Sequence, residues 1–409
     1  MKRIHYAWVM VGGAAVVLAV QAMTFYSFGI FLRPITLQFE WDRGALSIAM
    51  SLMMIVSGVG SIFAGRLSDR YGPRILLTAA GVLVGAGFLL MSRISQLWQV
   101  YLLYGGLIAI GNAAIVVPIT TTVMRWFVQK RGLALGLTWT GIGTGGVTAP
   151  ILAQWIINAS DWRLAFVVLG GLNIAVLVPL AQLMRGSPEQ MGLKPYGADS
   201  PPRLNEMPKA TTSITFRQAL RLPQFWLVGA MLFCLVFIGQ VMANHLAPHS
   251  ADIGISPTIA ATFVSVFAAT SLLGRNLCGF ITDRAGSRRT MLAGFILILA
   301  GMVWLVFARD VWALYAFSLW YGISFGIVVP LQSLMPGELF GLKSLGTITA
   351  ALMFMGTIGG AISSPLAGAI FDAQLKYDLA FYLCIGAAAV GLALAVTLLL
   401  LTRPKVAHE

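Results

Sequence analysis

The sequence predicts an all-α membrane protein with twelve transmembrane helices in two pseudo-symmetric halves of six. Three observations predict this fold class: an apolar composition, twelve long apolar stretches, and motifs that repeat at one spacing. Of the 409 residues, 58% are hydrophobic and 10% are charged, whereas a soluble domain carries roughly 45–50% apolar and about 25% charged residues. One water-soluble core cannot hide so much apolar surface. The composition therefore excludes a soluble enzyme, a disordered protein and a disulfide-built secreted module.

Twelve apolar stretches are long enough to cross about 30 Å of hydrocarbon, which takes about 20 helical residues. Helices are predicted because isolated strands cannot satisfy their backbone hydrogen bonds in lipid, and barrel strands would be about ten residues long with strict alternation. The first stretch is too long for the apolar core of a signal peptide. The stretches are approximately 7–31, 45–67, 75–92, 98–121, 132–156, 163–184, 224–247, 258–281, 290–308, 312–334, 344–371 and 379–401.

Basic residues are divided unevenly between the two sides of the expected membrane. Of the 27 Lys and Arg residues, 20 fall on the side that the two termini share. This bias predicts cytoplasmic termini and a cytoplasmic 185–223 loop. The net charge of +13 comes from these short gaps between spans, so no nucleic-acid partner is expected. Arg275 lies inside a span, and the other side holds Arg33, Arg43, Arg93, Arg163, Arg309 and Lys376.

A polar, proline-rich segment divides the chain into a bundle at 1–184, a linker at 185–223 and a bundle at 224–409. The linker is expected to contain a short surface helix near Thr215–Leu220. The two halves repeat each other: Gly65–Arg74 matches Gly279–Arg288 at an offset of 214 residues. Gly141, Gly145 and Pro150 match Gly356, Gly360 and Pro365 at an offset of 215. Equal topology in the halves predicts parallel repeats about an axis along the membrane normal.

No motif indicates an enzyme, a metal or a cofactor. The three cysteines, Cys234, Cys278 and Cys384, stand in apolar sequence without a CxxC or Cys/His cluster, and are predicted to be packing residues. The glycine-rich run 141–146 lacks the Gly-Lys-Ser/Thr ending of a phosphate loop and lies in a span. It predicts close helix packing, and no ATP site is expected.

The pattern G-x-x-x-D-R-x-G-x-R after spans 2 and 8, within twelve spans, resembles the major facilitator superfamily over the whole chain. Further motifs resemble its monocarboxylate and oxalate–formate branch, and most of all bacterial monocarboxylate transporters. The resemblance implies a carboxylate transporter of the cell inner membrane. The motifs are Y-S-F-G-I-F at 26–31, W-F at 126–127 with K-R-G-L-A-L-G at 130–136, D-W-R at 161–163, H-L-A-P at 245–248 and G-R at 274–275.

The sequence also departs from that branch. Animal monocarboxylate transporters carry an Asp four residues before the span-8 Arg, where this chain has Ser271, and a Lys in span 1 that this chain lacks. The oxalate–formate exchanger carries a Lys in span 11, and 344–371 contains none. The missing second cation argues against a dicarboxylate, and the missing Asp leaves the usual proton-coupling residue without a counterpart at that position.

Arg275 is the sharpest single signal for function. It precedes Asp283 by eight residues, about 12 Å along a helix, which places it near the bilayer midplane. A charge there costs about 2.5–3.5 kcal/mol on insertion scales and marks a substrate path by default. No Asp or Glu lies at the centre of any span. The guanidinium therefore predicts a carboxylate ligand held by two hydrogen bonds. The alternative is a structural arginine that bonds backbone carbonyls or extends to the inner surface.

His245 is the only histidine inside an expected span. An imidazole titrates near pH 6.5, so it could carry a proton, and a nearby carboxylate substrate would favour its charged form. The alternative is a neutral histidine packed at the end of span 7.

Five uncharged residues are candidates to contact substrate. Ser271 lies one helical turn before Arg275 and bonds either substrate or a carbonyl of its own helix. The others are Asn112, Tyr26, Tyr321 and Phe325, for which ordinary packing between helices is the alternative.

The two repeated loops are candidate gates, since an aspartate can accept hydrogen bonds from a helix N-terminus or from an arginine. The alternative is a solvated turn that obeys the positive-inside bias. The gating candidates are Asp69, Arg70, Arg74, Asp283, Arg284 and Arg288.

Together these features predict a secondary transporter of small monocarboxylates such as lactate or pyruvate, coupled to a proton and functional as a monomer. Arg275 would hold the carboxylate and His245 the proton, unless the proton travels with the acid. The main alternative is a carboxylate:carboxylate antiporter. A drug or sugar transporter fits less well because the span centres offer one arginine and no acid. A ligand sensor would need an appended signalling domain, for which the termini leave no room.

Overall fold

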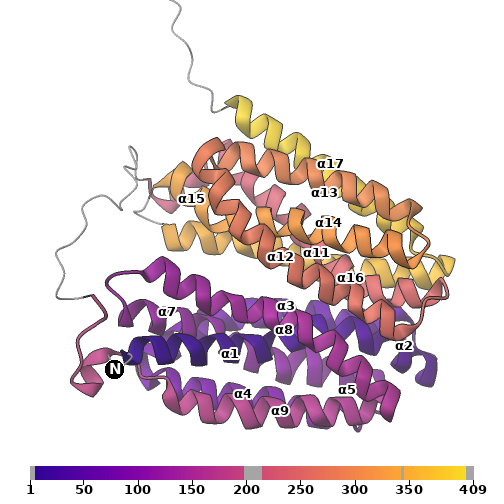
Figure 1. Ribbon diagram of the computed structural model, residues 1–409, viewed down its shortest axis with the longest axis horizontal. Coiled ribbons are helices and arrows are strands. Elements are labelled where there is room, and N and C mark those ends of the chain that lie inside the picture. The colour runs from indigo at the N-terminus through magenta and orange to yellow at the C-terminus, as the bar shows by residue number, and fades with distance from the viewer. Residues whose placement is uncertain (1–4, 198–213, 342–344, 402–409) are drawn as a thin grey trace, which may run out of the picture. The chain divides into compact units, whose positions relative to one another are not determined.

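The computed structural model describes residues 5–197, 214–341 and 345–401, and the regular elements within them are helices, apart from one isolated bridge between Phe127 and Tyr196 (Figure 1). The helices are α1 Tyr6–Tyr26, α2 Phe28–Phe39, α3 Arg43–Tyr71, α4 Pro73–Met91, α5 Leu97–Val100, the π-helix η1 Tyr101–Ile108, α6 Ala109–Ala113, α7 Val116–Trp126, α8 Arg131–Ala159, α9 Trp162–Leu183, the 3₁₀ helix η2 Pro188–Met191, α10 Phe216–Ala219, α11 Pro223–Asp252, α12 Pro257–Ala285, α13 Ser287–Phe307, α14 Val311–Val328, α15 Leu331–Phe340, α16 Leu345–Gln374 and α17 Asp378–Leu401.

The expected membrane spans are confirmed as long helical segments. Among the described residues, 11 are long and apolar enough to cross a membrane by length and composition. The twelfth expected span, 132–156, corresponds to α8, which is long enough at 29 residues. Its many glycine and threonine residues lower its hydropathy, so it is not among the 11.

The chain forms two compact units. The first comprises Met1–Asn205 together with Ala243–Ser265, and the second comprises Glu206–Met242 with Val266–Glu409. The end of α11 and the start of α12 therefore pack with the first unit. The division at 1–184, 185–223 and 224–409 that the repeats indicate stays a prediction about the sequence.

Close helix packing in the first unit explains the glycine-rich run of α8. In this unit α1 packs along α8, and α4 packs along α9. A Cβ added at Gly141 would lie 1.9 Å from the Ala15 carbonyl oxygen, and one at Gly145 would lie 2.0 Å from that of Ala19. Only glycine allows such an approach of two backbones. The expected role of this run is confirmed.

The repeated motif adopts the same turn in both halves. Gly72, between α3 and α4, has φ 81° and ψ 157°, and Gly286, between α12 and α13, has φ 80° and ψ 156°. Positive φ values are accessible to glycine at little steric cost. The match in backbone conformation supports the internal repeat that the sequence indicated.

Three of the expected spans are interrupted, although each was expected to be one continuous helix. The first breaks at Ser27, the fourth at Ala114–Ile115 and the tenth at Val329–Pro330. Proline explains two of the breaks, because Pro118 and Pro330 have no N–H to donate to the carbonyl four residues earlier. At the first break, the Ser27 hydroxyl and the Ser27 N–H both donate to the Met23 carbonyl. Interrupted helices inside a membrane are tolerated where they are buried in protein or line a cavity.

The described ends of the linker attach to different units. Tyr196 donates its N–H to the Trp126 carbonyl at 2.9 Å in the first unit, and Ile214 donates to the Phe340 carbonyl at 3.1 Å in the second. The expected surface helix is confirmed as α10, which Thr215 caps by accepting a hydrogen bond from the Gln218 N–H.

Candidate functional site

Arg275 has no protein partner among the described residues. It lies in α12, ten residues before the end of that helix, and its side chain is partly exposed. It forms no ion pair or hydrogen bond with any residue that the structure describes, and its buried Nε atom has no hydrogen-bond partner. The expected alternative, an arginine bonded to backbone carbonyls, is therefore not observed. A partly buried guanidinium without a partner makes Arg275 a candidate site for an anion.

Glycine brings α12 and α14 into backbone contact beside Arg275. A Cβ added at Gly274 would lie 2.2 Å from the Ile323 carbonyl oxygen, and one at Gly326 would lie 2.2 Å from that of Ser271. Two more of the expected site residues, Tyr321 and Phe325, stand on the facing part of α14. The structure thus brings four predicted residues of the second unit, two on each helix, onto neighbouring turns.

The two aromatic candidates, Tyr321 and Phe325, belong to a cluster of packed rings from α12 and α14 in the second unit. Tyr321 is fully buried and stacks on Phe317, with ring centroids 5.5 Å apart and planes at 11°. Phe325 lies 5.7 Å from the Tyr321 ring and 5.6 Å from the Phe267 ring. Ser271 is buried and its hydroxyl donates to the Ala268 carbonyl at 2.7 Å, so it bonds its own helix, as one of its two interpretations expected.

The close approach at Gly274 leads to a testable expectation. We expect Gly274→Ala to reduce the carboxylate transport that the sequence predicts at least about tenfold, because the added methyl group forces α14 away from α12 and misplaces the residues around Arg275. Gly279→Ala is the matched control in the same helix, since a Cβ there meets nothing within 4 Å. Initial rates of uptake into proteoliposomes measure both variants. Equal rates for the two variants would contradict the positioning role of Gly274.

Tyr26 and Asn112 of the first unit stand at two of the helix interruptions. Tyr26 is the last residue of α1, and Asn112 lies in α6, directly after the π-helix η1. The Asn112 amide is buried; its Nδ2 donates to the Ile108 carbonyl at 3.2 Å, and its Oδ1 has no hydrogen-bond partner among the described residues. An unsatisfied buried amide costs about 1–3 kcal/mol, and π-helical turns are frequent at functional sites.

His245 is completely buried in α11 and belongs to the first unit, whereas Arg275 belongs to the second. It lies seven residues, about two helical turns, before Asp252. Full burial suits both of its expected roles, a proton carrier shielded from water and a packed neutral histidine.

The expected gates are placed at the ends of α3 and α12. The Arg70 guanidinium lies 5.2 Å from the centroid of the Tyr71 ring, and that of Arg284 lies 3.8 Å from the Phe280 ring. Arg74 is half-buried and its Nε has no hydrogen-bond partner among the described residues, while Arg288 is half-buried. Both aspartates, Asp69 and Asp283, sit on these helices, but their side chains lie outside the described residues. The gating role stays a prediction.

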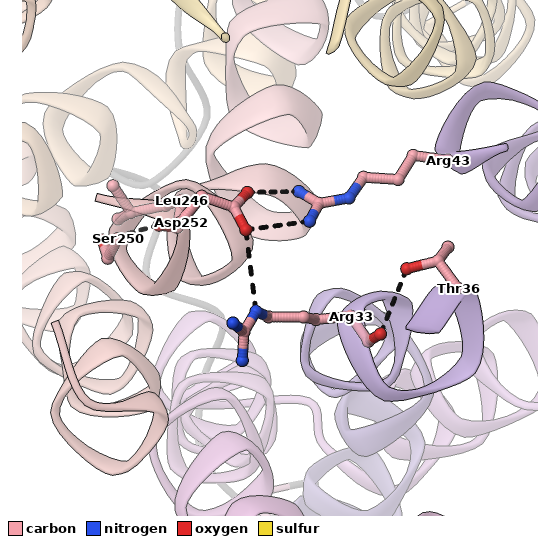
Figure 2. Close-up of polar contacts among 6 residues, drawn as sticks. All are labelled: Arg33, Thr36, Arg43, Leu246, Ser250 and Asp252. Carbon is pink, nitrogen blue, oxygen red and sulfur yellow. Dashed lines mark hydrogen bonds and ion pairs between the residues drawn. The ribbon is translucent and has the colours of Figure 1, made fainter. Parts of the chain in front are cut away.

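Sequence reasoning missed a charged cluster in the first unit (Figure 2). Arg43, at the start of α3, makes two hydrogen bonds to the Asp252 carboxylate, at 2.5 and 2.9 Å. The Nε of Arg33, in α2, lies 3.6 Å from the same carboxylate. In the sequence, both arginines stood out only as exceptions on the side with few basic residues. The available signal was Asp252, the sole acid between residues 207 and 282.

Comparison with protein families yields one match. The family described as the Major Facilitator Superfamily matches residues 14–364 and again 241–409. A crystal structure of a bacterial homolog of the human lysosomal transporter Spinster, in an inward-facing and occupied conformation, aligns with a TM-score of 0.74. That alignment covers 97% of this chain and 94% of the other at 16% identity, and it supports the fold.

Curated relatives include transporters of animals and bacteria. Monocarboxylate transporter 13 of Bos taurus is 27% identical over 92% of this chain and 85% of its own length. Monocarboxylate transporter 11 of Homo sapiens is 29% identical over 91% of this chain and 79% of its own. The Escherichia coli MFS-type transporter YhjX is 22% identical over 78% of this chain and 77% of its own.

Proposed function

This chain belongs to the Major Facilitator Superfamily, and we propose that it is a proton-coupled transporter of small monocarboxylates such as lactate or pyruvate. As a member of that family it is a multi-pass membrane protein and a secondary transporter, not an enzyme. It is also distantly related to monocarboxylate transporters. The substrate, the proton and the orientation in the membrane belong to the proposal.

The observation that carries the proposal is the guanidinium of Arg275, for which the described residues supply neither an acid nor a hydrogen-bond acceptor. A monocarboxylate satisfies it with two parallel hydrogen bonds and brings one compensating charge. The partly exposed Phe325 ring, which packs against the buried Tyr321, supplies an apolar surface for the short carbon chain of such an acid. Asn112 and Tyr26, at the interrupted helices of the first unit, remain candidates to contact substrate.

Charge balance favours coupling to one proton. The empty site carries the single positive charge of Arg275, the bound anion cancels it, and a proton on His245 restores it. The loaded and empty carriers then cross with equal charge, so transport is electroneutral. The two halves rock about the site and expose it to each side in turn, with the repeated loops at 69–74 and 283–288 acting as gates.

The proposal includes a location and an assembly state. The excess of basic residues on the side of the termini supports cytoplasmic ends in a cell inner membrane. Each chain carries its own candidate site residues, which supports function as a monomer.

Uptake of labelled lactate into proteoliposomes tests the proposal. We expect an inward proton gradient to accelerate net uptake several-fold without creating a membrane potential. Exchange of external for internal carboxylate, with no net uptake under a proton gradient, would contradict symport and support the antiporter instead.

In the same assay, we expect His245→Ala to abolish acceleration by the proton gradient while leaving lactate exchange measurable, because the proton acceptor is lost and Arg275 is retained. The control is His249→Ala, which removes the other histidine of α11, also buried and four residues away. If acceleration survives in His245→Ala, the proton travels with the acid itself.

A further inference from the structure

The first unit contains a cavity of about 190 Å³ next to the cluster of Arg33, Arg43 and Asp252. Its wall comes from four helices, α2, α8, α11 and the start of α12, all within that unit. Arg33, Gln154 and Asn158 supply its polar surface, and Leu37 and Pro248 are among the apolar residues that complete it. The cavity thus combines one cation with an apolar lining and is large enough for an acid of a few heavy atoms.

Charge in the cluster is not balanced within the described residues. Asp252 is already neutralised by Arg43, which binds it through two nitrogens and whose side chain is only 8% exposed. Arg33 contributes a second positive charge, and only its Nε approaches the carboxylate, at 3.6 Å. In Figure 2 the dashed line from Asp252 reaches the Nε of Arg33, and none reaches its two terminal nitrogens. The three side chains therefore keep a net charge of +1.

The neighbouring amides do not satisfy Arg33. Gln154 donates to the Asn158 side-chain oxygen at 2.8 Å, and Asn158 donates to the Thr258 hydroxyl at 2.8 Å. The first hydrogen bond joins two amides within α8, and the second ties α8 to α12. Asp252 is the only described side chain that pairs with the Arg33 guanidinium. The Arg33 side chain is 38% exposed. Its terminal nitrogens remain available as donors for an anion that enters the cavity.

We infer that this cavity is a second anion site, separate from Arg275, and that it takes a small monocarboxylate. The carboxylate binds the terminal nitrogens of Arg33, and a short carbon chain packs against Leu37 and Pro248. The anionic character follows from the charges alone, whereas the choice of a monocarboxylate rests on the proposed function. A site of this kind raises the local concentration of the anion at one end of the first unit.

A thiol beside Arg33 can report both the charge and the occupant. Leu37 is 68% exposed and stands four residues after Arg33 in α2, on the same face of the helix. The native cysteines, Cys234, Cys278 and Cys384, are buried, so a Leu37→Cys thiol is the accessible one. In nanodiscs, rates of modification by an anionic and by a cationic methanethiosulfonate reagent measure the local potential.

We expect the ratio of the modification rate by the anionic reagent to that by the cationic reagent to fall roughly fivefold when Arg33→Gln is added to Leu37→Cys. A positive charge one helical turn from the thiol attracts the anionic reagent and repels the cationic one. Lactate should slow thiol modification in a saturable manner in Leu37→Cys, but not in Leu37→Cys with Arg33→Gln. Uncharged lactamide should leave the modification rate unchanged in both. Arg93→Gln is the charge-matched control, because Arg93 is exposed in the same unit and does not line the cavity. It should leave the ratio unchanged.

The outcomes separate this inference from the proposed function. Protection by lactate that survives in Arg275→Gln supports a separate site, even if that variant or the native chain transports no lactate. Protection that survives in Arg33→Gln, or disappears in Arg275→Gln, overturns it. Equal protection by chloride and lactate overturns the monocarboxylate assignment.

Discussion

Replacing Arg275 by glutamine is expected to reduce lactate uptake by about a hundredfold or more. Two hydrogen bonds from a charged donor are each worth about 1.5–3 kcal/mol, and 1.4 kcal/mol corresponds to a factor of ten. Arg275→Lys keeps the charge but loses the planar pair of donors, so it should retain only a small part of the activity. Initial rates in proteoliposomes under an inward proton gradient measure both variants.

Stability separates a ligand-binding arginine from a structural one. Because Arg275 pairs with no described residue, we expect Arg275→Gln to leave the thermal midpoint of the purified protein unchanged or to raise it. Lactate should stabilise the native protein and not this variant. Arg289→Gln, which removes an exposed arginine of α13, serves as the control for both readouts. Normal uptake by Arg275→Gln, or a large loss of stability, would remove Arg275 from the proposed role.

Replacing Asp252 by asparagine is expected to lower the free energy of unfolding by about 3–5 kcal/mol. The variant keeps the shape of the side chain but removes the carboxylate that neutralises Arg43 and approaches Arg33, and Arg43 is only 6% exposed. The Asp252 side chain is 21% exposed but that of Arg43 only 8%, so the variant leaves the Arg43 charge buried without its partner, which costs this much in buried pairs. Chemical denaturation of the purified protein, followed by intrinsic fluorescence, measures the loss.

An exposed pair of the same chemistry provides the control. Arg309 and Asp378 pair at 3.1 Å in the second unit, with side chains 55% and 34% exposed. We expect Asp378→Asn to cost no more than about 1 kcal/mol, since water screens an exposed pair. Replacing both partners of the buried pair, as Arg43→Met with Asp252→Leu, should recover most of the stability. Equal losses of unfolding free energy in Asp252→Asn and Asp378→Asn would show that the pair of Arg43 and Asp252 stabilises the protein no more than an exposed pair does.

Much of the fold was predictable because the membrane constrains it. A chain in hydrocarbon must satisfy its backbone within helices of about 20 residues, so hydropathy located 11 of the spans among the described residues, and length located α8. Repetition of the turn at Gly72 and Gly286 was also visible, because only glycine adopts its positive φ without strain. The role of Gly141 followed from its residue type and its place in a span. These features depend on local chemistry, which sequence records directly.

The interruptions of the first, fourth and tenth spans were not predicted. Hydropathy does not register a broken helix, because the residues on both sides of Ser27 or Pro330 are equally apolar. Tyr26, Asn112 and Phe325 each lie within the last turn before a break. Their selection from sequence rested on polarity, aromaticity and resemblance, whereas the structure gives them a shared backbone context.

The amino-acid sequence alone was enough to predict twelve membrane spans, the repetition of the halves, and Arg275 as a charge without an acid in its span. These conclusions need only the composition, the spacing of motifs and the free-energy cost of a charge in the hydrocarbon core of a membrane. Tertiary structure decided which charges meet: Arg43 and Asp252 are 209 residues apart, and nothing in their local sequence pairs them. It also decided that Arg33 keeps a free face beside a cavity. Such pairings depend on how helices pack, and packing is a property of the folded chain.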